Sequence, residues 1–257
     1  MRIVVILIAA ASLAACDAST TTSETTVAPS AVPVSQVARA LNDTGQIWCT
    51  NSHNTQVACP ASGLQGQDGD HGRDAQARAG SLTKTPYGGG AQAFDLTKLD
   101  TLGNKLAANA SGHNCVADNV TGLMWEVKAA SGLRDYRHTY SWYNGASGHL
   151  NGGTCANDSC DTQAFVEAVN QQALCGYNDW RLPTVAELRS IIHYGASVPT
   201  VDQDYFPRTE NAWYWTSSEH PASANGAWNI KFNFGRSNFA IKSVASHVRL
   251  VRTGSVQ

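Results

Sequence analysis

The sequence predicts an α+β domain in the second half of the chain, with long loops rich in glycine and asparagine. Two segments show the apolar period of a helix, and short alternating segments typical of strands follow them. The 257 residues include 22 glycines, which favours a loop-rich domain over a helical bundle. The pattern becomes regular from about residue 113, so we expect one domain over residues 113–253.

The first predicted strand of this domain lies in VTGLMWEVK, residues 120–128. The first helix is expected in DTQAFVEAVNQQALCG, with Asp161 as its N-cap and Gly176 as its end. Its apolar face is predicted to consist of Phe165, Ala168, Val169 and Ala173.

The second helix is expected in NDWRLPTVAELRSII, residues 178–192. Thr184 and Glu187 have the spacing of a capping box, and Pro183 directly precedes them. Trp180 and Arg181 stand in an extended segment before the helix. Because the cap accounts for Glu187, we interpret the stretch as structural bracing and not as a catalytic site. The buried face is expected to be Leu188, Ile191 and Ile192, with Gly195 ending the helix.

The last strands are predicted from alternation. The segment AWNIKFNFG, residues 227–235, indicates a half-buried strand that ends in a glycine turn. Its apolar positions Trp228, Ile230, Phe232 and Phe234 alternate with Asn229, Lys231 and Asn233. The segment HVRLVR, residues 247–252, closes the domain as a short strand.

The N-terminus has the pattern of an export signal. Arg2 precedes an apolar run over residues 3–15, which is short for a transmembrane helix and ends in LAAC. Small residues before Cys16 resemble the bacterial lipobox, in which this cysteine is acylated; an ordinary signal peptide cut near Ala15 is the alternative. Residues 17–36 are rich in Thr, Ser, Ala and Pro, which is typical of a flexible tether.

The cysteine count agrees with export. Removing Cys16 from the seven cysteines leaves six, which predict disulfides with fifteen formal connectivities. Two pairs are close in sequence, and the third pair then forms a long-range link. The expected pairs are Cys49 with Cys59, Cys155 with Cys160, and Cys115 with Cys175. The spacings do not match those of a zinc site.

Residues 37–112 form a loop-rich segment without a clear pattern. Glycines recur every three residues in GLQGQDGDHGRD, but four triplets without proline are too few for a collagen helix. Asp68, Asp70 and Asp74 lie close together there, which is a candidate calcium site. No bidentate glutamate follows at loop spacing, so a Gly-Asp turn is favoured and no cofactor or metal is expected.

Several motifs resemble the Lcl C-terminal domain family: TGLMWE, YSWYN, CDTQAFVEAVN, LCGYNDWRLPTVAEL, YWTSSE and the terminal VRLVR. They run in order from about Cys115 to Arg252. This resemblance implies an exported bacterial module with a C-type-lectin-like fold that adheres to sulfated polysaccharide. RLPT is also similar to the formylglycine-generating enzyme family. Those enzymes need a reactive cysteine pair near the end of the domain, and this chain has no cysteine after Cys175.

The end of the chain is basic. No acidic residue follows Glu219, whereas the net charge of the whole chain is −2 and gives no reason to expect nucleic acid as a partner. These basic residues are candidates for a polyanion-binding face, or they are simply the solvated face of a sheet. The candidates are Lys231, Arg236, Lys242, Arg249 and Arg252.

Together these observations predict a non-enzymatic, lipid-anchored protein of the bacterial cell envelope, periplasmic or surface-exposed. Its lectin-like domain is expected to bind or adhere, with polyanionic glycans as candidate ligands. One alternative is an envelope assembly protein that binds another protein through exposed aromatics in NAWYWTSSEH, residues 211–220. A divergent enzyme on the same fold is the second alternative.

Overall fold

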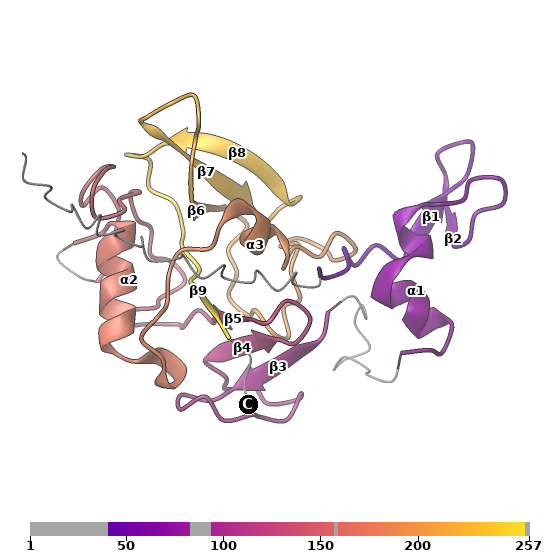
Figure 1. Cartoon of the computed structure of the whole chain (residues 1–257), viewed down its shortest axis with the longest axis horizontal. Coiled ribbons are helices and arrows are strands. Elements are labelled where there is room, and N and C mark those ends of the chain that lie inside the picture. Colours follow the sequence, from indigo (N-terminus) through magenta and orange to yellow (C-terminus); the bar gives the residue numbers. More distant parts are fainter. Residues whose placement is uncertain (1–40, 83–93, 157–158, 255–257) are drawn as a thin grey trace, which may run out of the picture. The chain divides into compact units, whose positions relative to one another are not determined.

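The structure of the protein is a computed structural model that describes residues 41–82, 94–156 and 159–254. These residues belong to one compact unit, Ala38–Gln257 (Figure 1). The predicted signal sequence, Cys16 and the whole of the predicted tether lie outside the described residues. None of the described helices is long and apolar enough to cross a membrane.

The segment before the main domain forms a small hairpin and a helix. Strand β1, Trp48–Thr50, pairs antiparallel with β2, Gln56–Ala58. A 3-10 helix at Asp68–Asp70 leads to α1, Gly72–Arg78, where the sequence favoured a Gly-Asp turn within a loop-rich segment.

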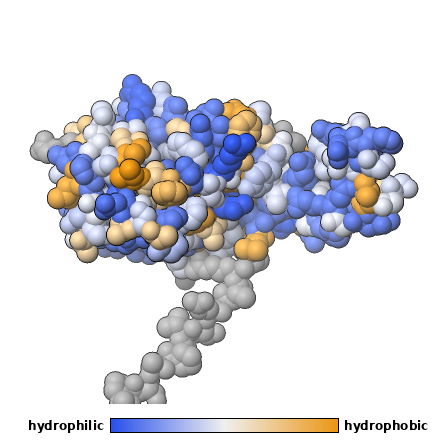
Figure 2. All heavy atoms as spheres, turned by 90° about the horizontal axis from the view of Figure 1, so that it is seen from above, coloured by the Kyte–Doolittle hydropathy of each residue, from blue (hydrophilic) through white to orange (hydrophobic). Residues whose placement is uncertain are grey.

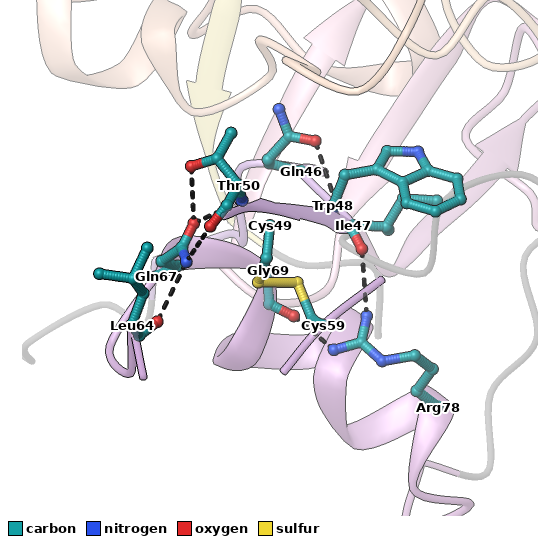
Figure 3. The surroundings of a disulfide bond; sticks show 10 residues. All are labelled: Gln46, Ile47, Trp48, Cys49, Thr50, Cys59, Leu64, Gln67, Gly69 and Arg78. Carbon is teal, nitrogen blue, oxygen red and sulfur yellow. Dashed lines mark hydrogen bonds between the residues drawn. A yellow bond between two sulfur atoms is a disulfide. The ribbon is translucent and has the colours of Figure 1, made fainter. Parts of the chain in front are cut away.

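The disulfide between Cys49 of β1 and Cys59, the residue after β2, joins the two strands of this hairpin (Figure 3). A β-carbon on Gly69 would lie 2.6 Å from the Cys59 sulfur, so this position needs glycine. Arg78 of α1 donates hydrogen bonds to the backbone oxygens of Gly69 and Ile47. The disulfide and these bonds together hold a segment that is too small to have a large apolar core of its own.

A four-stranded antiparallel sheet lies at the centre of the main domain, in the order β3-β4-β5-β9. Its strands are β3 (Leu96–Leu99), β4 (Cys115–Asp118), β5 (Leu123–Glu126) and β9 (Val251–Thr253). All residues of β4 and β5 are buried, because both faces of the sheet are covered. The last strand therefore closes the domain as predicted, although it begins at Val251, four residues later than His247, where the predicted segment starts.

Consecutive residues of β4 and β5 pack into two different apolar clusters, one on each face of the sheet. Ala117 and Met124 pack in one cluster with Phe165 and Val169 of helix α2, Thr162–Gln171. Val116, Leu123 and Trp125 pack in the other with Leu188 of helix α3, Val185–Arg189, and with Ile191 and Ile192. Each helix therefore covers its own face of the sheet, as the period-two alternation of a strand requires.

Both helices begin where the sequence predicts and end earlier. The side chain of Asp161 caps α2, and Thr184 with Glu187 forms the capping box of α3. Helix α2 ends at Gln171 and not at Gly176, because Ala173 takes a left-handed backbone conformation with φ 47°. Ala173 is consequently exposed and does not join the apolar face. Helix α3 ends at Arg189 and not at Gly195.

A second antiparallel sheet has the order β6-β7-β8. Its strands are β6 (Trp213–Glu219), β7 (Gly226–Lys231) and β8 (Arg236–Ile241). The predicted alternation fails here, since Asn229 is 2% exposed while Phe234, in the turn after β7, is 58% exposed. The apolar clusters reach both faces of β7, through Ala227 on one face and Ile230 on the other.

The three predicted disulfides are present with the predicted pairing. Cys115 is joined to Cys175, Cys155 to Cys160, and Cys49 to Cys59. The Cys115–Cys175 link spans a sequence separation of 60 residues, and both of its cysteines are fully buried in the cluster that contains Phe165. It joins β4 to the segment that follows α2.

Candidate ligand-binding face

One row of side chains crosses all three strands of the second sheet. Trp213 of β6 is paired with Lys231 of β7, and Lys231 is paired with Arg236 of β8. Directly paired residues of an antiparallel sheet lie on the same face, so the three side chains are neighbours. The Lys231 ammonium lies 5.7 Å from the centroid of the Trp213 ring. We call Trp213, Lys231 and Arg236 the basic face.

The two cations of the basic face have no acidic partner among the described residues. The ion pairs found there involve other residues, and neither Lys231 nor Arg236 takes part in one. Lys231 is half-buried beside the indole and Arg236 is exposed. Two adjacent uncompensated cations at the surface attract anionic groups, and the neighbouring aromatic ring adds a flat apolar surface.

The next row on the same face is polar and partly buried. Trp215, Asn229 and Asn238 are paired across β6, β7 and β8. The Asn238 side chain is exposed, whereas Asn229 lies beneath the surface. The Oδ1 atom of Asn229 accepts no hydrogen bond within the described part of the chain. A buried polar group without a partner is uncommon in proteins, and it calls for a physical explanation.

A cavity of about 260 Å³ lies over this row. Its wall includes Trp213, Asn229 and Asn238 of the sheet, together with Ser246 and His247 of the segment before β9. Burial lowers the pKa of His247, so its imidazole is neutral at neutral pH. The positive charge next to the cavity therefore comes from the basic face.

Three of the five predicted basic site residues do not reach the surface, so the prediction of one face formed by all five was wrong. Lys242 is 3% exposed, pairs with Glu219 at 2.7 Å and lies over the Trp142 ring. Arg252 bonds to Asp179 at 2.6 Å. These two charges are compensated by acidic partners that precede them in the chain and are themselves partly exposed.

Arg249 is the most deeply placed of the three. It is fully buried and donates hydrogen bonds to the backbone oxygen of Glu126 and to the Thr209 hydroxyl. Its guanidinium also lies 5.0 Å from the Phe206 ring centroid. A side chain enclosed in this way stabilises the interior of the domain and cannot contact a polyanion at the surface.

The predicted exposed aromatics of residues 211–220 also need correction. Tyr214 and Trp215 are fully buried, because the two apolar clusters cover opposite faces of β6. The aromatic surface of this sheet lies on the opposite face of β7 and β8, where the centroid of the His220 ring is 5.2 Å from that of Trp228 and 4.4 Å from that of Phe239. Phe239 is 45% exposed.

The residues in and around RLPT, residues 181–184, make contacts that hold separate segments of the domain together. Trp180 is 2% exposed, and its indole nitrogen donates to the backbone oxygen of Leu174. Arg181 forms an ion pair with Glu187 at 2.6 Å, and the Pro183 carbonyl accepts a hydrogen bond from Ser217. A cavity of about 430 Å³ borders Arg181 and Thr184, but these two side chains already bond to Glu187.

The three aspartates of the candidate calcium site make different contacts and do not form one set of ligands. Asp74 is buried in α1, and Asp68 accepts a hydrogen bond from the Thr44 hydroxyl. Asp70 lies near Cys49 and Cys59, and these three form a cluster of potential metal ligands among the described residues. Both cysteines are in a disulfide, and their sulfurs are therefore not thiolate ligands.

The fold defines a small α+β domain, braced by disulfides, with a cavity beside two cations that have no acidic partner in the described part of the chain. The chain belongs to the Lcl C-terminal domain family, whose family model matches residues 114–252, more than half of the sequence. The search of the curated proteins gave no match to this chain.

Proposed function

We propose that this chain is a non-enzymatic binding protein of the bacterial cell envelope, and that its C-type-lectin-like domain binds polyanionic glycans through the basic face. The observation that carries the proposal is the pairing of Lys231 with Arg236 beside Trp213. A sulfate or carboxylate can accept hydrogen bonds from both cations at once. The apolar face of a sugar ring can lie on the indole.

Envelope localisation rests on two features of the sequence and the structure. The leader that ends at Cys16 resembles a lipobox, so the membrane partner is a lipid anchor on that cysteine. The six other cysteines are all in disulfides, which persist in oxidising compartments outside the cytoplasm.

The disulfide state of the cysteines agrees better with a binding role than with formylglycine-generating chemistry. That chemistry needs reactive thiolates, and each of the six cysteines after Cys16 is held in a disulfide. The carboxylate of the RLPT stretch, Glu187, is committed to Arg181 and to the start of α3.

The proposal is tested by measuring binding of the full chain to immobilised dextran sulfate, with uncharged dextran of the same length as the control. We expect binding to dextran sulfate that weakens as salt is raised from about 0.05 M to 0.5 M, because screening shortens the reach of surface charges. Equal binding to both polymers, or to neither at low salt, would contradict the proposal.

A protein partner is the second candidate, favoured by the aromatic surface on the other face of β7 and β8. Trp228 and Phe239 are paired there, and Ile241 at the end of β8 is 60% exposed. On the side of the molecule seen in Figure 2, hydrophobic residues form small separate groups within a mostly hydrophilic surface. Co-purification that is lost in Phe239→Ser but kept in Lys231→Ala would favour this candidate over glycan binding.

A further inference from the structure

We propose that the cavity above Asn229 takes one uncharged, hydroxylated ring of the ligand, so that a single sugar residue is recognised by hydrogen bonds next to the basic face. The inference rests on the proposed function for the class of ligand. It goes beyond that function by assigning a pocket that binds part of the ligand without using charge.

Asn229 provides the first argument. Its side chain is 2% exposed, lines the cavity, and has an Oδ1 atom without a hydrogen-bond partner among the described residues. Burying such an acceptor without a donor is unfavourable, so the group is suited to a ligand that brings a hydroxyl or an N–H into the cavity. The amide rotates about a soft torsion, so it can present either its oxygen or its nitrogen.

The size of the cavity provides the second argument. Its volume of about 260 Å³ is below the range of roughly 300–1,000 Å³ typical of sites for drug-sized ligands. It equals the liquid volume of about nine water molecules, since one water occupies about 30 Å³. A cavity of this size admits one sugar ring and is too small to enclose several linked residues.

The walls match the two sides of a sugar ring. Trp213 and Val244 contribute apolar surface, while Asn229, Asn238 and Ser246 contribute amide and hydroxyl groups. A pyranose has apolar C–H faces and a polar rim of hydroxyls. The combination of an indole with several neutral polar groups is therefore suited to it, whereas a wholly apolar ligand would strand the amides.

The spacing along β7 connects this pocket to the basic face. Asn229 and Lys231 lie two residues apart on the same strand and on the same face. With a rise of about 3.3 Å per residue, their α-carbons are separated by roughly 6.6 Å. A ring over Asn229 can therefore place an anionic substituent near Lys231 and Arg236.

The test measures binding of uncharged methyl glycosides of common hexoses and N-acetylhexosamines to the full chain. Calorimetry and saturation-transfer NMR are performed at about 1 M salt, where the Debye length of about 3 Å suppresses the contribution of the basic face. We expect at least one glycoside to bind, and Asn229→Ala to weaken this binding about tenfold, the effect of one lost hydrogen bond to a buried group.

Asn233→Ala is the matched control. Asn233 also has a buried Oδ1 without a partner among the described residues, but it does not line the cavity, so its removal should leave glycoside binding unchanged. If Asn229→Ala fails to fold, Asn238→Ala tests the same pocket from its exposed rim.

Two results would overturn the pocket assignment. One is that no glycoside of the panel binds the wild type, in which case the cavity holds only water. The other is that the Asn229 and Asn238 variants bind the glycoside as tightly as the wild type. Either result is distinct from failure of the proposed function, which is judged by dextran sulfate at low salt.

Discussion

Arg181 and Glu187 are joined by two parallel hydrogen bonds, from Nη1 to Oε2 at 2.8 Å and from Nη2 to Oε1 at 2.6 Å. The same carboxylate accepts the backbone N–H of Thr184 and closes the first turn of α3. Arg181 also exchanges two backbone hydrogen bonds with Val251 of β9. This pair therefore ties the start of a helix to the four-stranded sheet, which is a structural role.

Replacement of Glu187 should destabilise the domain without a specific effect on binding. Glu187→Ala removes the cap and leaves the Arg181 guanidinium without its acidic partner, so we expect the free energy of unfolding to fall by about 1–3 kcal/mol. Denaturant unfolding measures this loss. Glu167→Ala is the control, because Glu167 lies exposed on α2. A well-folded Glu187→Ala protein that has lost all ligand binding would contradict the bracing role.

The contribution of Glu187 should depend on pH. Burial alone raises the pKa of this carboxyl, but hydrogen bonds from Arg181 and Thr184 outweigh it and the net pKa is lowered. The stabilisation is therefore complete above the unfolded pKa of about 4.3 and is lost as the pH falls through the folded value. The free energies of unfolding of the wild type and of Glu187→Gln should therefore converge as the pH is lowered. A difference that stays constant with pH would contradict this contribution of the ionised Glu187.

Arg249→Ala should unfold or strongly destabilise the domain, although Arg249 was predicted as a surface binding residue. The change strands the Thr209 hydroxyl and a backbone carbonyl in the interior and leaves a cavity. We expect a loss of about 3–5 kcal/mol. Lys231→Ala, at the surface, should change stability by no more than about 0.5 kcal/mol. Comparable thermal midpoints for the two variants would show that Arg249 is not a structural residue.

The disulfides should contribute unequally to stability. In the chain-entropy relation, Cys115–Cys175, with a separation of 60, contributes about 4 kcal/mol, and Cys155–Cys160, with a separation of 5, about 2 kcal/mol. The double alanine variants of each pair can be compared by denaturant unfolding. An equal loss for both pairs would show that loop length does not control their effect.

Cys16 should carry the lipid anchor. Metabolic labelling with a radioactive fatty acid should label the wild type, and Cys16→Ser should be unlabelled and either released or left as the precursor. Labelling that is equal in both, or absent from the wild type, would refute the lipobox.

The local features of the fold could be predicted because they depend on neighbours in sequence. The cap of Asp161, the capping box of Thr184 and Glu187, and the short-range disulfides all follow from residue type and spacing. The ends of the helices could not be predicted. Gly176 and Gly195 have the residue type of helix ends, but α2 and α3 end earlier, at Gln171 and Arg189. After α2 the cause is the positive φ of Ala173, which the residue type does not indicate.

The candidate site could be predicted only in part, because a basic residue does not reveal its burial. Lys231 and Arg236 are close to the surface, whereas Lys242 and Arg252 form ion pairs with Glu219 and Asp179. These partners are distant in the chain, so no local pattern indicates the pairing. Asn229 was interpreted as an outward polar position of a half-buried strand. Its 2% exposure reflects tertiary packing, since it lies at a cavity that is also lined by Ser246, a residue distant from it in the chain.

The central claim, that the basic face binds the polyanion, is tested most directly by charge reversal. The dissociation constant for dextran sulfate is measured at low salt for the wild type, for Lys231→Glu/Arg236→Glu and for Lys105→Glu/Arg208→Glu. The control pair is likewise one lysine and one arginine, both exposed, so the change in net charge is identical. We predict that the first double variant, still folded, binds at least about tenfold more weakly, a loss of about 1.4 kcal/mol, while the control binds almost as the wild type does. Equal weakening in the two variants would mean that only net charge matters, and would contradict a site at Lys231 and Arg236.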